Sequence, residues 1–310
     1  MGVLRISLFG KFHVQCGGQD VSAFCAPKVQ ELFCYLLLHR DRPQSREALA
    51  SLLWSNGSTT QSKKHLRQAL WHLQAALGSQ TLRASHLLTA EPEWVQLSTH
   101  PSVALDVSEF EQAFAIAQGI PDQEMNDHGA QALQSAIQLY TGDLLEGWYQ
   151  DWCLYERERL QNMYLMMLDK MMGYCEANCN YDAGLACGAL ILRYDRAHER
   201  THRRLMRLHF LAGDRTAALR QYERCVVALQ EELDVQPARR TVALYEQIRA
   251  DQLSGVAPTP VVERAMVETA NSSLPEVIGR LKQLQSILAE AQRQIQHDIQ
   301  AVEMIVNGRR

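Results

Sequence analysis

The segment from residue 60 to residue 77 carries side chains suited to contacting DNA. Read as a helix, it presents one apolar face that must point into a core. That face consists of Leu66, Ala69, Leu70, Leu73 and Leu77. The opposite face carries Lys64, Arg67, Gln68, Trp71 and His72, with Gln61, Lys63 and His65 near the start, and the segment contains no Asp or Glu. A helix with one apolar and one basic face fits the major groove, which is about 12 Å wide.

Each residue type on the basic face has a partner in duplex DNA. Lys and Arg bind phosphate or guanine, Gln binds adenine, and Trp or His packs on sugar and on the thymine methyl group. The alternative is a solvated helix face, which normally mixes both charge signs. The absence of Asp and Glu from residues 60–77 argues against that alternative. The charge distribution also favours a nucleic-acid partner for the first part of the chain, because residues 1–100 have a net charge of +4, whereas residues 101–310 have −8.

The elements around this helix predict how it is held. Two strands at 3–9 and 11–15, with a third near Val21, precede helices at 27–39 and 45–54. A hairpin of residues 87–89 and 94–97 follows. This order predicts a winged helix-turn-helix, in which the third helix enters the groove and the hairpin is the wing. Arg42 and Arg46 at the second helix, and His86 and Thr89 on the wing, are either backbone contacts or plain surface.

Composition excludes several classes of protein. The chain has 310 residues, which predicts about two domains, and its 46% hydrophobic and 21% charged residues are typical of a globular protein. No apolar run approaches the roughly 20 residues that span a bilayer. We therefore expect a cytoplasmic protein with no membrane partner. The eight cysteines are irregularly spaced and form no zinc or redox motif, so we expect no metal and no cofactor.

The second half of the chain predicts stacked helices. A repeat of 34 residues aligns residues 179–185 with residues 213–219, and small residues at 183–184 and 217–218 allow helices to approach closely. This is the tetratricopeptide pattern. Further helices are expected at about 130–140, 151–168 and 240–250.

The last segment predicts an oligomer. Residues 254–261 are typical of a linker. A heptad pattern then runs through Leu281, Leu284, Leu288, Ala291, Ile295, Val302 and Ile305, with Asp298 as a polar exception. Four heptads predict a coiled coil that makes a homo-oligomer, a dimer or higher. The alternative is a helix packed onto the preceding domain.

Motifs along most of the chain resemble the Streptomyces antibiotic regulatory protein (SARP) family. The DNA-binding half is represented by Leu8-Phe-Gly10, Lys28…Leu36-Leu-Leu-His39, Ser45-Arg-Glu-Ala-Leu-Ala50 and Leu66-Arg-Gln-Ala-Leu70. The bacterial transcriptional activator domain is represented by Asp106-Val-Ser-Glu-Phe110, Leu139-Tyr-Thr-Gly-Asp-Leu-Leu145, Glu156-Arg-Glu-Arg-Leu160, His202-Arg-Arg-Leu-Met206, Ala218-Leu-Arg-Gln-Tyr222 and Glu232-Leu-Asp-Val-Gln-Pro237. The resemblance implies a cytoplasmic activator that binds direct repeats near promoters and recruits RNA polymerase holoenzyme.

Three departures limit what the resemblance carries over. The third helix ends in Gln74-Ala-Ala76, where family members are usually rich in Arg. Trp71 and His72 on the exposed face of this helix are distinctive, so the family resemblance does not predict the operator sequence. The terminal heptads are not part of the shared family core.

Other functions have little support in the sequence. The carboxylate pairs Glu156/Glu158 and Glu231/Glu232 are expected on solvated helix faces, and His198 and His202 lack the Glu of an HExxH zinc site. Tyr140, Trp148, Trp152 and Tyr155 are expected in the core. A tetratricopeptide interaction scaffold or a ligand sensor, with a non-specific DNA-binding domain, is the alternative, although a scaffold needs no basic groove helix.

The sequence thus predicts a mainly α protein that is not an enzyme. Its expected parts are an α+β winged helix-turn-helix domain (1–100), a tetratricopeptide-like activator domain (105–250), a linker (251–275) and a coiled-coil helix (276–306).

Overall fold

The computed structural model describes residues 3–252, apart from residues 22, 23, 25, 56, 80–83, 85, 86, 99–102 and 121–124. The heptad segment, nearly all of the expected linker and His86 therefore lie outside the described residues. Within the described ranges, no helix is both long and apolar enough to cross a membrane.

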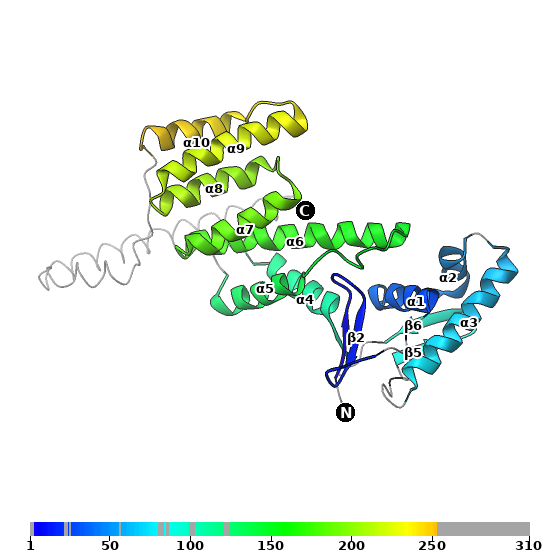
Figure 1. Cartoon of the computed structure of the whole chain (residues 1–310). Helices are drawn as coiled ribbons and strands as arrows, with labels where there is room; N and C mark the ends of the chain where they lie inside the picture. The colour runs from blue at the N-terminus through cyan, green and yellow to red at the C-terminus, as the bar shows by residue number, and fades with distance from the viewer. Residues whose placement is uncertain are drawn as a thin grey trace, which may run out of the picture. The chain divides into compact units, whose positions relative to one another are not determined.

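The N-terminal part, residues 3–105, contains two small sheets around three helices (Figure 1). Its elements are β1 (Leu4–Ser7), β2 (His13–Cys16), β3 (Gln19–Asp20), α1 (Pro27–Leu38), β4 (Gln44–Ser45), α2 (Arg46–Leu53), α3 (Thr59–Leu77), β5 (Leu88–Ala90), β6 (Trp94–Leu97) and β7 (Val103–Leu105). One sheet has the order β3-β2-β1-β7, and the other has the order β4-β6-β5. The predicted order of strands, three helices and a hairpin is confirmed.

Local sequence explains where these helices begin. Pro27 occupies the first turn of α1, where its missing N–H costs nothing. Ser58 caps α3 in a reciprocal capping box: its hydroxyl accepts from the Gln61 backbone N–H, and the Gln61 side chain accepts from the Ser58 N–H. The five apolar residues predicted on one face of α3 are all buried, with Leu73 and Leu77 fully so.

Two strand pairings join segments that are distant in the sequence. Strand β7 pairs in parallel with β1, with Leu4 opposite Val103, although it lies beyond residue 100. Strand β4 pairs with β6, which ties the start of α2 to the wing. Both strands have only two or three residues, so they show no periodicity that predicts them.

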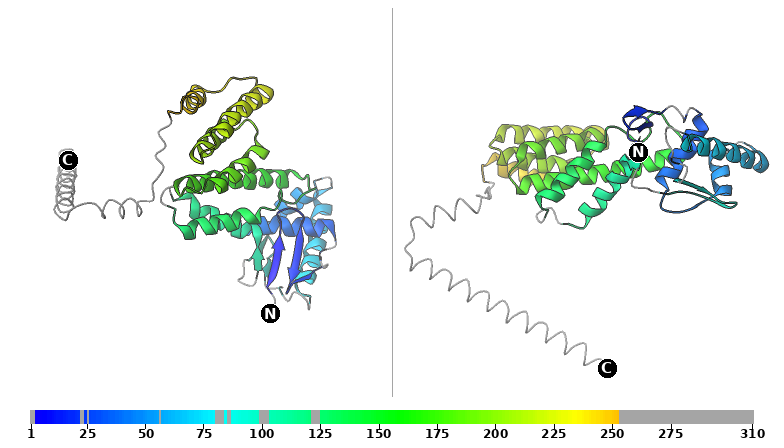
Figure 2. Two further views of the ribbon diagram at one scale, coloured as in Figure 1. Left: turned by 60° about the vertical axis from the view of Figure 1, so that its left-hand side comes forward. Right: turned by 90° about the horizontal axis from the view of Figure 1, so that it is seen from below.

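The helical part, residues 106–252, is a stack of helices (Figure 2). Its elements are α4 (Asp106–Gln118), α5 (Asp127–Leu139), α6 (Asp151–Ala177), α7 (Tyr181–Tyr194), α8 (Glu199–Leu211), α9 (Arg215–Leu233) and α10 (Arg239–Arg249). The 34-residue repeat is visible in the backbone. Cys179 and Gly213, which the repeat aligns, both have a positive φ (57° and 84°) in the turns before α7 and α9.

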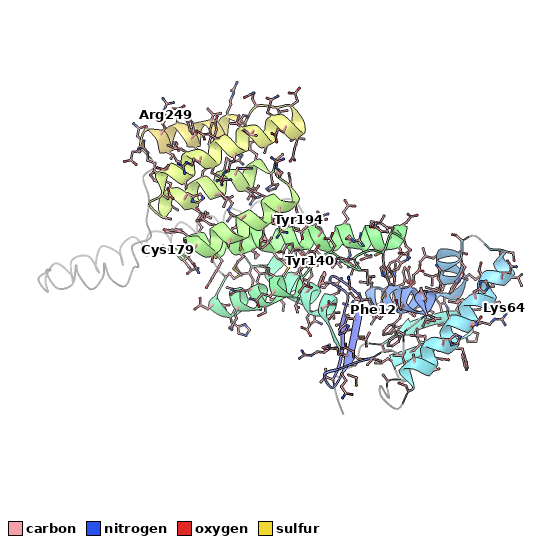
Figure 3. The ribbon with its side chains drawn as sticks, viewed as in Figure 1. Phe12, Lys64, Tyr140, Cys179, Tyr194 and Arg249 are labelled. Atoms are coloured by element: carbon pink, nitrogen blue, oxygen red, sulfur yellow. The ribbon has the colours of Figure 1, made fainter. Side chains whose placement is uncertain are left out.

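Small residues let these helices approach closely, as the sequence predicted. A Cβ on Gly184 would lie 3.0 Å from Leu208 Cδ1, and a Cβ on Gly188 would lie 2.5 Å from Leu205 Cδ2. The rings of Tyr140 and Tyr164 are stacked with centroids 4.2 Å apart, and Tyr194 meets Tyr164 edge to face. Tyr140 and Tyr194 are labelled in Figure 3.

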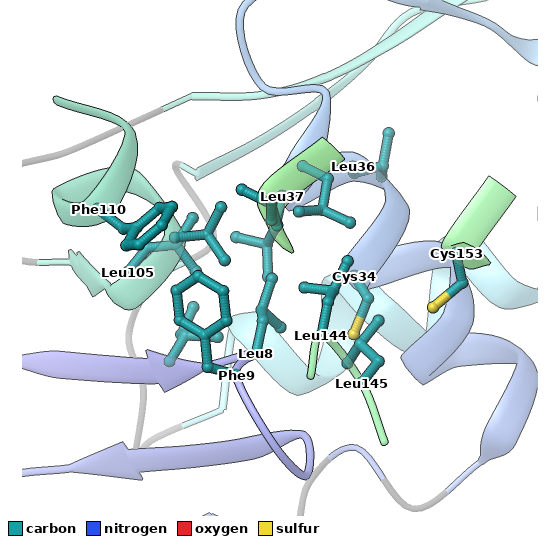
Figure 4. Close-up of a cluster of buried hydrophobic side chains, with 14 of the residues drawn as sticks. Leu8, Phe9, Cys34, Leu36, Leu37, Leu105, Phe110, Leu144, Leu145 and Cys153 are labelled. Carbon is teal, nitrogen blue, oxygen red and sulfur yellow. The ribbon is translucent and has the colours of Figure 1, made fainter. Parts of the chain in front are cut away.

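One hydrophobic core joins the N-terminal part to the helical part (Figure 4). Phe9, after β1, contacts Phe110 of α4 and Tyr140 at the end of α5, with ring centroids 5.1 and 4.8 Å apart. Backbone contacts also link the two parts: Gly10 N donates to the Asp143 carbonyl (2.8 Å), and Phe9 forms a β-bridge with Leu144. We call this region of contact the joint. The two parts therefore share a core, which favours a fixed relative orientation.

Hydrogen bonds from polar side chains also stabilise the joint between the two parts. One carboxylate oxygen of Asp106 accepts from the backbone N–H groups of Leu8 (2.7 Å) and Phe9 (3.0 Å). Burial raises the pKa of Asp106 to about 6, although these hydrogen bonds oppose the shift. Arg157 of α6 donates to the carbonyl oxygens of Leu144, Leu145 and Trp148, each at 2.9 Å, and so holds the loop after α5.

The structure corrects two predictions for the helical part, those for Glu156 and Tyr155, and it also defines the surroundings of His202. Glu156 is not on a solvated face: it is buried and pairs with Arg159 at 2.7 Å, because α6 turns that face toward the joint. Tyr155 was expected in the core but is 69% exposed, since it lies on the outer side of α6. His202 is buried, and its ring nitrogens contact the Arg196 carbonyl and the Gln221 side-chain nitrogen.

Candidate DNA-binding surface

The outer face of α3 exposes the side chains that the sequence assigned to DNA. Lys63, Lys64, Arg67, Gln68, Trp71 and His72 are all exposed, whereas the leucines of the same helix are buried. Lys64 lies on the outer edge of the N-terminal part (Figure 3). The structure therefore brings these six residues together on one helix face, free of contact with the core.

Trp71 is the most unusual residue on this face. Its side chain is 64% exposed, and its ring meets His72 edge to face with centroids 4.9 Å apart. An exposed indole leaves apolar area in water, which a partner surface can cover. In duplex DNA, sugars and thymine methyl groups offer such a surface.

Lys63 differs from its neighbours because an acid lies beside it. Its ammonium group pairs with the carboxylate of Glu47, in the first turn of α2. The hydrogen bond and charge of Lys63 lower the pKa of Glu47. Since both side chains are exposed, the pair is weak, and it partly neutralises the positive charge at the start of α3.

A groove of about 840 Å³ lies between α2, α3 and the wing. Arg46, Lys63 and Arg67 line it, together with the acids Glu47 and Glu93. The groove therefore combines both charge signs, whereas the exposed face of α3 beyond it carries Lys64, Gln68, Trp71 and His72 and no acid.

The two arginines near α2 have different surroundings. The backbone N–H of Arg46 donates to the Glu93 carbonyl, and its guanidinium donates to the Glu91 carbonyl, both at 2.9 Å. Arg46 thus fixes the wing against α2. Arg42 is exposed. Burial raises the pKa of Tyr35, and the charge of Arg42 opposes this rise.

The wing carries one residue that the sequence analysis did not select. Trp94, at the start of β6, is 47% exposed and lines the groove beside α3. Its signal in the sequence was an aromatic residue directly after the hairpin turn. Thr89 on β5 is exposed, as a backbone contact from the wing requires.

No group of three His, Cys, Asp or Glu side chains in the described ranges is arranged to hold a metal ion. None of the seven cysteines that the structure describes forms a disulfide bond. Hence neither a metal centre nor a disulfide shapes this surface in the described residues.

Comparison with known proteins agrees with this arrangement. Residues 105–249 match the model of the bacterial transcriptional activator domain. The chain is 21% identical over 259 residues to the transcriptional regulatory protein MoaR1 of Mycobacterium tuberculosis and to MoaR1 of Mycobacterium bovis, covering 80% of this chain and 79% of those proteins. Residues 105–249 therefore form a bacterial transcriptional activator domain, and the whole chain is similar to transcriptional regulators that resemble the SARP family.

The fold of this chain is also that of a solved structure. Mycobacterium tuberculosis EmbR, in complex with a low-affinity phosphopeptide, superposes with a TM-score of 0.63 at 20% identity. The match covers 81% of this chain and 66% of the EmbR chain, slightly less than two-thirds of its length. It confirms the predicted architecture of a winged helix-turn-helix followed by stacked helices.

Proposed function

We infer that this chain is a SARP-family regulator that binds specific DNA sequences by placing α3 in the major groove. The observation that carries this proposal is the six-residue exposed face of α3, which holds three cations and no acid. Lys64 and Arg67 supply charge for phosphate or guanine, Gln68 suits adenine, and Trp71 supplies apolar contact. Arg46 and Trp94 contribute from the groove between α3 and the wing.

The rigid joint suggests how DNA binding is passed to the helical part. Because Phe9, Asp106 and Glu111 lock the two parts together, α3 and α4 turn as one body when DNA is bound. The helical part is then held at a fixed position on the promoter. From there we propose that it recruits RNA polymerase holoenzyme and activates transcription in the cytoplasm, without catalysing a reaction of its own.

Direct repeats are the DNA sites that we propose, and an oligomer would bind them best. Two copies joined through residues 276–306 engage two half-sites at once, which raises the effective concentration of the second copy. The apolar heptad positions carry this part of the proposal. In the full chain, Leu288→Asp with Ile295→Asp is expected to give a monomer by sedimentation. An unchanged sedimentation coefficient would contradict oligomerisation through this segment.

Binding of α3 to DNA is tested on a duplex selected for the full chain. Lys64→Ala and Arg67→Ala each cost about 1–3 kcal/mol of binding free energy where the contact is to a base, and they relax specificity at that position. Where the contact is to phosphate, binding weakens for all sequences. The slope of the logarithm of the binding constant against the logarithm of the salt concentration then falls in magnitude by about 1. Arg240→Ala, an exposed cation on α10, is the matched control. Unchanged affinity and slope in both α3 variants would overturn the proposal.

A further inference from the structure

A second basic surface lies in the helical part, away from α3. It is a groove of about 510 Å³ formed by α7, α8 and α9 and the turn after α7. Within the unit of residues 1–253, helices α7, α8 and α9 lie toward the opposite end from α3 (Figure 1). We therefore do not expect DNA bound by α3 to occupy the α7–α9 groove.

The α7–α9 groove combines an apolar floor with a basic rim. Its floor includes Ala189, Leu192 and Leu205. Its rim holds the exposed arginines Arg193, Arg196 and Arg224, and no Asp or Glu belongs to its lining. The neighbouring groove of about 410 Å³ between α4, α6 and α8 is different, because Asp169 and Asp195 line it together with two cations.

The rim keeps a net positive charge even after its ion pairs are considered. Arg196 faces Glu231 (3.1 Å) and Glu232 (3.7 Å), both outside the groove lining. Arg193 has no ion-pair partner within 4 Å among the described residues, and Arg224 contacts only a neutral amide, that of Gln221. Because residues 101–310 have a net charge of −8, this rim is a local exception that attracts anionic groups.

The buried polar groups of the floor are already satisfied. The side-chain nitrogen of Gln221 lies 2.8 Å from His202 Nδ1, and His202 Nε2 lies 2.9 Å from the Arg196 carbonyl oxygen. Burial lowers the pKa of His202, which leaves the ring neutral near pH 7. A small-molecule site usually offers buried polar groups that converge on the ligand. Among the described lining residues, the exposed guanidinium groups of the rim supply charged donors, as at the edge of a protein interface.

We propose that the α7–α9 groove binds an acidic, leucine-bearing peptide segment of a partner protein. Leucine side chains of the segment cover the floor at Leu192 and Leu205, and its carboxylates pair with Arg193 and Arg224. Guanidinium groups suit this role because they bind carboxylates through two parallel hydrogen bonds. The binding does not depend on DNA recognition by α3.

The test uses the full chain and two fluorescent peptides of 12 residues. One alternates Asp with Leu, and the other alternates Asn with Leu; both have blocked termini. Fluorescence anisotropy is expected to show binding of the acidic peptide, at least ten-fold weaker binding of the amide peptide, and weakening by added salt. Arg193→Ala with Arg224→Ala is expected to weaken binding of the acidic peptide at least ten-fold. Ala189→Trp, which fills an exposed part of the floor, is expected to abolish it.

The matched control is Arg239→Ala with Arg240→Ala, which removes the same charge from exposed positions of α10. The proposal is overturned by no binding, by equal binding of the two peptides, or by equal losses in the groove and control variants. A change in oligomeric state on Arg193→Ala with Arg224→Ala would also overturn it, because the occupant would then be a second copy. Loss of DNA binding in that variant, with peptide binding intact, would assign the arginines to DNA.

Discussion

Arg40, just after α1, and Glu111, on α4, form an ion pair of 2.6 Å across the joint between the N-terminal and helical parts. The Arg40 side chain is only 8% exposed. Glu111 also pairs with Arg159 at 2.6 Å, and Arg159 pairs with Glu156, so charges of alternating sign connect α1, α4 and α6. Together with Asp106, this network anchors the polar side of the joint.

Arg40→Ala removes one partner of this buried pair. We expect the free energy of unfolding to fall by about 3 kcal/mol, at the low end of the usual range because Glu111 keeps Arg159. Chemical denaturation measures this change. Arg249→Ala breaks a pair in which both side chains are exposed, and it should change stability by less than about 0.5 kcal/mol. Similar losses in the two variants would contradict a buried anchor at Arg40.

Trp71→Ala is expected to weaken DNA binding while leaving the stability of the fold nearly unchanged. Because Trp71 is 64% exposed, its removal should change the free energy of unfolding by no more than about 0.5 kcal/mol while weakening DNA binding. Trp152→Ala is the contrasting variant, since Trp152 is buried at the joint and contacts Tyr35; it should cost about 3–5 kcal/mol. Denaturation and DNA titration measure both effects. A large loss of stability with Trp71→Ala would mean that the residue is structural.

Gly188→Ala tests the close approach of α7 to α8. The added Cβ would lie 2.5 Å from Leu205 Cδ2, so overpacking should cost about 1–3 kcal/mol even though Ala favours helices. Gly119→Ala, at the end of α4, has open space and a φ of −81°. It should be neutral or stabilise by up to about 1 kcal/mol. Thermal unfolding compares them, and equal effects would contradict the packing argument.

Asp106 predicts a pH dependence of stability. Its pKa of about 6 in the folded protein exceeds the ordinary value of 3.8, so the folded state binds the proton more tightly than the unfolded state. The group therefore favours folding most below pH 4, and this contribution, on the order of 3 kcal/mol, is lost as pH rises through 6. Asn does not titrate. The stability of the wild type minus that of Asp106→Asn should fall between pH 4 and pH 6. A flat difference would show that Asp106 is not perturbed.

Sequence periodicity predicted the elements but not every face that they bury. The leucine seam of α3 and the 34-residue repeat were read correctly, because a regular spacing fixes which residues share a face. Burial of Glu156 and exposure of Tyr155 were misread, since α6 packs on different neighbours along its length. Strands β4 and β7 were missed because their pairing is long-range and their residues are few.

The exposure of the α3 face was predictable from the same seam, yet its surroundings were not. Glu47 beside Lys63, the wing carbonyl groups that hold Arg46, and Trp94 in the groove all come from other elements. Only the tertiary structure brings them to α3. The specific DNA contacts of the six predicted residues remain predictions.

Selection of DNA by the full chain from a randomised duplex pool, at two salt concentrations, tests the central claim most directly. We expect an enriched repeat motif whose spacing gives the distance between half-sites, and we expect Arg67→Ala to lose the enrichment. Weak, salt-sensitive binding with no enriched sequence, unchanged by Arg67→Ala, would contradict recognition of DNA by α3.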